Sequence, residues 1–198
     1  MCHLMRMKSP EVDIFDIAIF CYGDYNFAED RHLLRPLSDI NEDEIEFHGT
    51  SGRTNFNIPL RFCHELLQQY DQQYLTLQEE PQKVPPPLIL FVSDGCHMNG
   101  RNPVFLAKKI NSTALSIGVP PILVTIGLEL GGDKPDEELL KAMASRGRHN
   151  QPLYFDVTDL LQFEELLATL GSSAACTPDD VSTVVDDQKR LPPPGGVK

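Results

Sequence analysis

The sequence Leu88-Ile89-Leu90-Phe91-Val92-Ser93-Asp94-Gly95 joins an unbroken apolar run to an abrupt polar end. Five apolar residues are too few to cross a membrane, and they predict a strand that is buried on both faces, as in a parallel sheet. The strand would carry Asp94 to the carboxyl edge of that sheet, where ligands bind in open α/β folds. The alternative is that Asp94 only closes a turn, because Asp-Gly is a common turn dipeptide.

Strands and helices are predicted to alternate along the rest of the chain. Short apolar runs rich in β-branched and aromatic residues predict further strands at residues 14–21, 121–127 and 153–157. Weaker patterns at residues 33–37 and 45–47 indicate short edge-strand pieces. Apolar residues at spacings of three and four predict helices over residues 59–74, 103–117, 136–146 and 159–170. This alternation predicts an α/β fold with a doubly wound, mostly parallel sheet that has helices on both faces.

The helix ends and buried faces can be predicted in more detail. Pro59 is expected at the first position of its helix, and Asn102 is expected to cap a helix that starts at Pro103. Thr158 or Asp159 should cap the last helix and Gly171 should end it. The residues expected to face the sheet are Leu60, Cys63, Leu67, Tyr70, Tyr74, Val104, Ala107, Ile110, Ala114, Ile117, Leu160, Phe163, Leu167 and Leu170.

The length suits one domain followed by a tail. A chain of 198 residues can bury a substantial core. Residues 1–171 are expected to form that domain. Residues 172–198 have no apolar periodicity and few large apolar side chains, so they predict a flexible tail.

Charge, apolar runs and cysteine content indicate which partners and which compartment to expect. The net charge is −12 and the basic residues are scattered singly or in pairs such as Lys108-Lys109, which argues against nucleic acid. No signal segment and no apolar run of membrane-spanning length is visible, so we expect a cytoplasmic protein without membrane contact. Five cysteines without paired spacing predict reduced thiols.

Several enzyme classes lack their motifs in this sequence. There is no phosphate-binding glycine loop, no Gly-x-Ser-x-Gly nucleophile turn and no His-Glu-x-x-His zinc pair. Two oxygen-bearing side chains remain, the hydroxyl of Thr54 and the carboxylate of Asp94, each in a loop next to a regular element. Such oxygens suit a hard cation such as Mg²⁺.

Four segments together resemble the von Willebrand factor type A (vWA) domain in content and order. They are Gly52-Arg53-Thr54-Asn55 before a helix, Leu88 to Gly95, Ile-Leu-Val-Thr-Ile-Gly at 122–127, and Tyr-Phe-Asp-Val-Thr-Asp-Leu at 154–160. The resemblance covers residues 12–170. It is nearest in character to intracellular, tellurite-resistance-type bacterial members of the family.

The resemblance implies a metal-ion-dependent adhesion site at the carboxyl edge of the sheet. The family's metal-binding threonine maps onto Thr54 and its last aspartate onto Asp94. A partner protein usually completes the metal shell with an acidic side chain, so the resemblance implies a binding module and not an enzyme. The residues expected on the partner-binding rim are Asp24, Ser51, Arg53, Ser93 and His97.

One part of the family pattern is missing. No Asp-x-Ser-x-Ser occurs in the chain, and residues 14–21 align with the family's second strand. We therefore expect an N-terminally truncated vWA-like domain that lacks its first, central strand and binds Mg²⁺ weakly at most. Two alternatives remain open: a small metal-assisted hydrolase that uses Asp94 with His97 or His64 as base, and a non-functional truncated remnant.

Overall fold

The computed structural model describes residues 16–19, 32–36, 54–76, 86–116, 118–129, 134–172, 181 and 183. Strands and helices alternate from β3 onward, as predicted. In chain order the elements are β1 (Asp16–Ile19), β2 (His32–Pro36), α2 (Asn57–Thr76), β3 (Leu88–Ser93), α3 (Val104–Asn111), β4 (Ile122–Leu128), α4 (Glu137–Met143), the 3₁₀ turn η3 (Arg148–Asn150), β5 (Tyr154–Val157) and α5 (Leu160–Ser172). The strand predicted at residues 45–47 lies outside the described residues.

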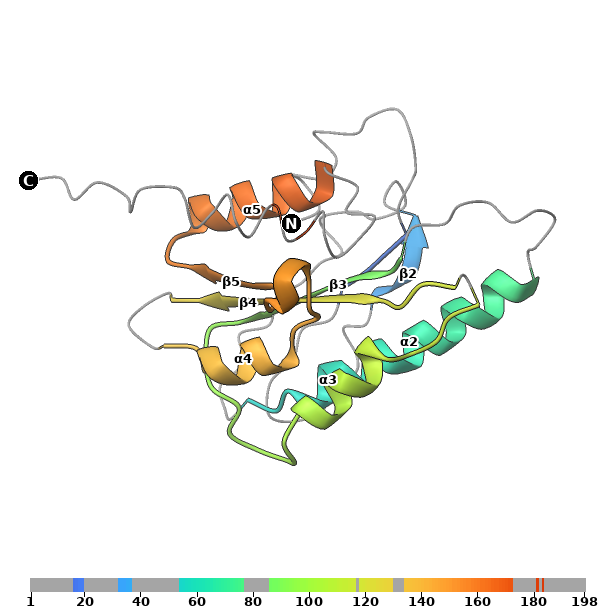
Figure 1. The fold of residues 1–198 in the computed structure, drawn as a ribbon, viewed down its shortest axis with the longest axis horizontal. Helices are drawn as coiled ribbons and strands as arrows, with labels where there is room; N and C mark the ends of the chain where they lie inside the picture. Colours follow the sequence, from blue (N-terminus) through green and yellow to red (C-terminus); the bar gives the residue numbers. More distant parts are fainter. Residues whose placement is uncertain are drawn as a thin grey trace, which may run out of the picture.

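The described strands form two sheets. β3, β4 and β5 form a parallel sheet in that order, with Leu88 opposite Ile122 and Thr125 opposite Tyr154. Helices α2, α3 and α4 lie on one face of this sheet and α5 on the other (Figure 1). The predicted α/β fold is thereby confirmed. β1 and β2 form a separate antiparallel pair with an irregular register between Ile17 and Ile19.

β4 is the buried centre of the parallel sheet. Its residues from Ile122 to Gly127 are all buried, and their side chains alternate between the two faces. Leu123 packs with the residues of α2, α3 and α4 in one hydrophobic cluster. Ile122, Val124 and Ile126 pack with β5 and α5 in a second cluster on the opposite face. Each layer of helices is therefore anchored on the same strand.

β3 is less buried than its sequence predicts. We expected a strand covered on both faces, but only Phe91 and Ser93 are buried, and Leu88, Ile89, Leu90 and Val92 keep part of their surface exposed. Within the described parallel sheet β3 is an outer strand with β4 as its neighbour. An apolar run alone does not distinguish an outer strand from a central one, which explains the error.

The first predicted helix is correct, but its start is not. α2 begins at Asn57, two residues before Pro59. The side chain of Asn55 accepts a hydrogen bond from the backbone N–H of Asn57, which caps the helix earlier than expected. Proline is still tolerated here, because the N–H groups of the first turn have no partner within the helix.

The next helix is shorter than predicted. Asn102 caps it as expected, accepting from the N–H of Val104, and Pro103 has helical dihedral angles. However, α3 ends at Asn111, and Ala114 is exposed where we expected it to be buried. The hydroxyl groups of Ser112 and Thr113 both donate to the carbonyl of Lys109. Such side-chain bonds compete with the helix backbone and favour its end.

The last helix keeps its predicted cap but not its predicted limits. The carboxylate of Asp159 accepts from the N–H of Gln162 at 2.9 Å. Leu160, expected to face the sheet, is exposed at the first position of α5, whereas Leu167 and Leu170 are buried as predicted. Gly171 lies inside α5 and does not end it. Of the segment predicted as a tail, the structure describes Ser172, Val181 and Thr183; Ser172 is the last residue of α5, and Val181 is buried in the second cluster.

A buried polar network ties β4 to its helices. The hydroxyl of Ser145 accepts from the N–H of Leu123 at 2.8 Å and donates to the side chain of Asn111 at 2.9 Å. Asn111 in turn donates to the carbonyl of Met143. The hydroxyl of Thr125 donates to the carbonyl of Leu140. Polar groups that are buried without partners are costly, so these bonds hold α3 and α4 in one position on the sheet.

His64 on α2 differs, because one of its buried polar atoms is not hydrogen-bonded to any described residue. Its Nδ1 is buried and has no hydrogen-bond partner among the described residues. Burial lowers the pKa of His64 below its ordinary 6.5. Lys109 on α3 lowers this pKa further, and Glu65 opposes the shift. Protonation would place a positive charge near Lys109 in a poorly hydrated position.

Mild acid is expected to destabilise the protein through His64. The unfolded chain takes up this proton near pH 6.5, whereas the folded chain takes it up only at lower pH. The free energy of unfolding should therefore fall as the pH decreases below 6.5, until the folded pKa is passed. Urea titrations at about pH 7.5 and 5.5 would measure this loss. His64→Gln should make this loss of unfolding free energy smaller, whereas the exposed control His149→Gln should leave it unchanged. An equal loss in the original protein and in both variants would contradict the prediction.

Candidate functional site

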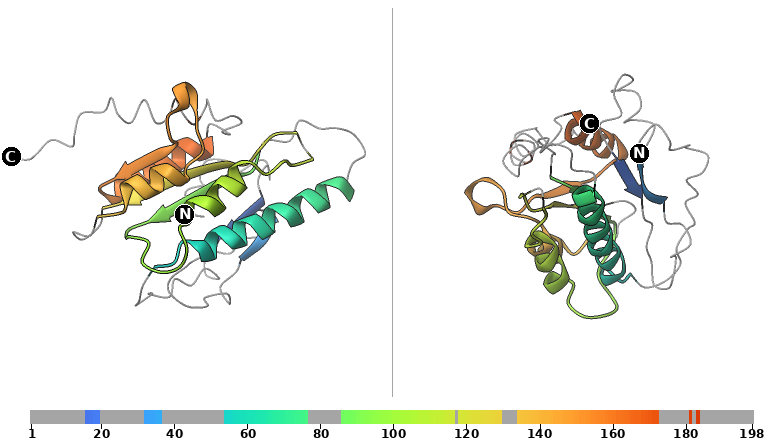
Figure 2. Two further views of the ribbon diagram at one scale, coloured as in Figure 1. Left: turned by 60° about the horizontal axis from the view of Figure 1, so that its bottom comes forward. Right: turned by 90° about the vertical axis from the view of Figure 1, so that its right-hand side faces the viewer.

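Two loops meet at the carboxyl edge of the parallel sheet. One is Thr54–Asn57, which leads into α2, and the other follows β3 from Asp94 to Arg101. The carbonyl of Thr54 accepts from the N–H groups of Met98 at 2.9 Å and Asn99 at 3.3 Å. In Figure 2 (left) the segments that enter α2 and α3 run along the same end of the molecule. The topology therefore brings together the loops of the two residues that the sequence singles out.

Thr54 and Asp94 lie at this junction. An ideal Cβ built on Gly95 would lie 3.9 Å from the hydroxyl oxygen of Thr54, so that hydroxyl is next to the residue that follows Asp94. Asp94 itself is exposed. Ser93, by contrast, is buried, and its hydroxyl bonds to the N–H and carbonyl of Gly95. Ser93 thus shapes the turn that presents Asp94.

His97 joins the two loops. Its Nδ1 accepts from the N–H of Phe56 at 3.2 Å, and its Nε2 lies 3.1 Å from the carbonyl of Arg101. This pattern fits a neutral ring with the proton on Nε2. The ring also lies against Phe56, with centroids 5.3 Å apart. Since both nitrogens are engaged, His97 would have to give up a structural bond to act as a base.

Two asparagines that the sequence analysis did not single out complete the junction. Asn57 donates to the carbonyl of Arg101 at 2.6 Å, and Asn55 turns the chain into α2. Gly100 has a φ of +95°, and a Cβ on it would lie 3.0 Å from the side chains of both asparagines. The Asn-x-Asn spacing just before a helix was the available signal, since asparagine favours turns and caps. Asp24, Ser51 and Arg53, also predicted on this rim, lie outside the described residues.

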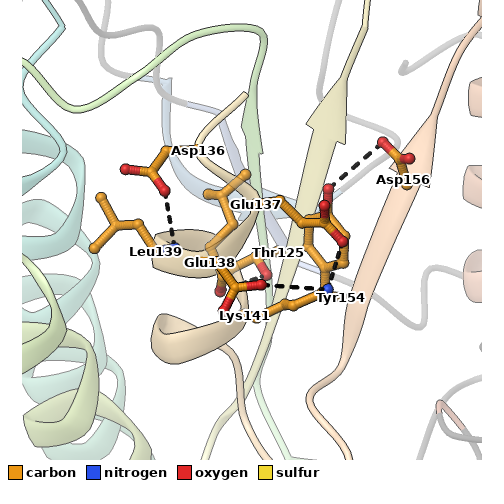
Figure 3. Close-up of polar contacts among 9 residues, drawn as sticks. Thr125, Asp136, Glu137, Glu138, Leu139, Lys141, Tyr154 and Asp156 are labelled. Carbon is orange, nitrogen blue, oxygen red and sulfur yellow. Dashed lines mark hydrogen bonds and ion pairs between the residues drawn. The ribbon is translucent and has the colours of Figure 1, made fainter. Parts of the chain in front are cut away.

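A second polar group lies at the carboxyl end of β4 and β5, as Figure 3 shows. The hydroxyl of Tyr154 lies 3.5 Å from the carboxylate of Asp156, and Lys141 lies over the tyrosine ring, 5.6 Å from its centroid. Lys141 also forms an ion pair with Glu137. A Cβ on Gly127 would lie 2.7 Å from the Tyr154 hydroxyl, so only glycine fits there without a shift.

Charge and burial shift the pKa values in this second group. Desolvation raises the pKa of Asp156, and the carboxylates of Glu137 and Glu129 raise it further. Desolvation, followed by the charge of Asp156, also raises the pKa of Tyr154. The hydrogen bond with Glu137 raises the pKa of Lys141. These groups satisfy one another, which is typical of a structural network at the base of α4.

Cys63 and His64 lie on α2, away from the two loops of the candidate site, and burial affects both. Burial raises the pKa of the Cys63 thiol to about 11, so it stays protonated at neutral pH and is a poor nucleophile. The Nδ1 atom of His64 is buried. Among the described residues, no three histidine, cysteine, aspartate or glutamate side chains come together in a group that could hold a metal ion. Nor do these residues include a helix long and apolar enough to span a bilayer.

Large apolar side chains are exposed at the same edge of the sheet. Met98 in the loop after β3 is 63% exposed, and Phe105 at the start of α3 is 79% exposed. Leu160 and Leu161, which begin α5 directly after β5, are 63% and 64% exposed. Val119, just before β4, is the one such residue at the opposite edge among the described residues. Phe105 and the pair Leu160–Leu161 begin helices that lie on opposite faces of the sheet (Figure 1).

Comparison of the chain with protein-family models, with curated proteins and with solved structures gives no match. The function must therefore be argued from the fold and from this edge of the sheet.

Gly127→Ala should destabilise the protein by about 1–3 kcal/mol, the usual cost of overpacking a buried position. The added methyl group would press on the Tyr154 hydroxyl and on Pro135, which lies 2.9 Å from it. Adding Tyr154→Phe should recover part of this loss, because it removes the closest atom.

Urea denaturation of the two single variants and the double variant measures this coupling. Gly95→Ala is the matched control, since its Cβ meets no atom closer than 3.9 Å. Strictly additive effects of Gly127→Ala and Tyr154→Phe would show that the hydroxyl is not what excludes a side chain at position 127.

Proposed function

We propose that this chain is a vWA-like protein-interaction module whose metal-ion-dependent adhesion site is incomplete. The observation that carries the proposal is the exposure of Met98 and Phe105, large apolar side chains in the segment that follows Asp94 at the carboxyl edge of the sheet. A mixture of exposed apolar side chains and a carboxylate suits recognition of a protein surface. The parallel α/β fold and the order of its segments support the family resemblance.

The residues of the site favour binding over catalysis. Asp94 is exposed, and the Thr54 hydroxyl lies beside the adjoining turn. His97, the base that a hydrolase would need here, is bonded at both ring nitrogens. Asp94 and Thr54 would instead contact the partner, directly or through a weakly held cation, and an acidic side chain of the partner would complete the cation's shell.

The donor set fits Mg²⁺ only in part. Carboxylate and hydroxyl oxygens are the right kind of ligand, but Mg²⁺ needs near-octahedral coordination and releases its water reluctantly. One carboxylate and one hydroxyl supply little of that shell and little charge. The site in this chain would therefore depend on water and on the partner's carboxylate for the remaining positions.

Titration calorimetry with Mg²⁺ is expected to show no affinity tighter than the millimolar range, about 4 kcal/mol of binding free energy. The matched variants are Asp94→Ala and Asp71→Ala, of which the second removes a carboxylate that bonds to Ser116, outside the site. Micromolar binding that Asp94→Ala abolishes and Asp71→Ala preserves would show that a complete ligand set exists.

The interaction itself can be tested with a photo-crosslinking residue. Placed at Met98 in the full chain and expressed in the native host, it should yield a discrete adduct with a partner protein. Placed at Val119, at the opposite edge, it should not. Asp94→Ala should reduce the Met98 adduct by about tenfold if the carboxylate contributes to recognition. Absence of any adduct, or equal adducts at the two positions, would refute the proposed function and favour a non-functional remnant.

A further inference from the structure

We infer that the outer face of α3 docks an acidic segment of the partner protein, one that also carries a bulky apolar side chain. This inference rests on the proposed function, because it identifies the kind of partner that the interaction module takes. It concerns a surface that adjoins the Asp94 loop but does not include the candidate metal ligands.

The helix presents one exposed stripe away from the sheet. Phe105, Lys108 and Lys109 are spaced as i, i+3 and i+4, and all three are exposed. Residues at these spacings lie on one face of a helix. The opposite face, with Ala107 and Ile110, is buried in the core. α3 lies between α2 and α4, both of which it contacts, so the exposed stripe forms the outside of that layer (Figure 1).

Phe105 is the apolar anchor of this stripe. It is 79% exposed, more than any other large apolar side chain of the described residues. A phenylalanine in this position gains nothing for folding from its ring, whereas a polar residue would be better solvated. Aromatic side chains of this kind are typical of the centres of protein interfaces, where they bury a large area at a small cost in side-chain entropy.

The charge around Phe105 is positive on a strongly acidic protein. No aspartate or glutamate occurs from Gly95 to Leu128, although the chain as a whole has a net charge of −12. Arg101, Lys108 and Lys109 are all exposed in this stretch. No ion pair of the described residues involves any of the three, whereas Lys134 and Lys141 are both paired with glutamates. The stripe is therefore a place where an acidic partner meets attraction instead of repulsion.

The positions of Lys108 and Lys109 also have a structural explanation, but it accounts for only part of what is observed on this face of α3. Lys108 and Lys109 lie in the last turn of α3, where positive charge stabilises the helix end. That effect accounts for neither the exposure of Phe105 nor the absence of acidic residues from this stretch of the sequence. An anionic membrane is a weaker candidate than a protein, because recognition of such a surface usually takes a cluster of about four to eight basic residues.

Synthetic peptides can test the inference on the full chain. The probes are fluorescent 12-residue peptides with an Asp/Glu-rich sequence and one central Leu, a Gln/Asn counterpart, and an acidic counterpart with Ala in place of Leu. The acidic peptide with Leu should bind best, and raising the salt concentration should weaken it, because its charges are screened. Phe105→Ser and the double variant Lys108→Glu, Lys109→Glu should each weaken binding by about tenfold or more. Val119→Ser and Lys134→Glu are the matched controls and should leave it unchanged.

Three results would overturn the inference. One is equal binding of the acidic peptide and its Gln/Asn counterpart, or no binding of either. Another is unchanged peptide binding in the α3 variants, with their fold verified by circular dichroism. The third is binding of the chain to vesicles containing phosphatidylserine, lost in the α3 variants, without peptide binding. If any of these results occurs while Met98 still crosslinks to a partner, the inference about α3 is refuted and the proposed interaction function is retained. If Met98 gives no crosslink, the proposed interaction function itself is refuted.

Discussion

The burial of β4 on both faces is the constraint on which the rest of the described fold depends. Six consecutive residues of this strand are buried, so their backbone groups must be paired and their side chains packed. β3 and β5 supply the parallel partners, and Ser145 pairs with both the N–H and the carbonyl of Leu123. The helices on the two faces then have to cover the two hydrophobic clusters that meet at this strand.

Fixing the sheet in this way also fixes the edge at which we place function. The parallel strands end together, so the loops after β3 and β5 and the start of α2 share one end of the domain. His97 and Asn57 then fasten the Asp94 loop to the Thr54 segment through Phe56 and Arg101. These bonds engage the ring of His97 and the side-chain amide of Asn57, whereas Asp94, Met98 and Phe105 are exposed. Such an edge is organised to present side chains, which accords with the proposed binding role.

Most of the fold could be predicted from short-range patterns. The apolar runs predict β3, β4 and β5, the spacing of three and four predicts the helices, and the polar residues Asn102 and Asp159 predict caps that the structure confirms. Where prediction failed, a competing local bond or the position within the sheet decided the outcome. Hydroxyl groups ended α3 early, and the outer position of β3 left an apolar strand partly exposed. Neither the hydroxyl bonds at the end of α3 nor the position of β3 in the sheet can be predicted from hydrophobic periodicity.

The sequence by itself determined the chemistry that the edge can offer: one carboxylate and one hydroxyl on neighbouring loops, basic residues only singly or in pairs, and no nucleophile or phosphate-binding motif. Only the tertiary structure decided how these groups are used. It placed the Thr54 hydroxyl beside the Asp94 turn, engaged both nitrogens of His97, and exposed Phe105 on the same helix as two lysines that form no ion pair with another described residue. The physical reason is that residue type is a local property, whereas burial, pairing and exposure depend on segments far apart in the chain that packing brings together.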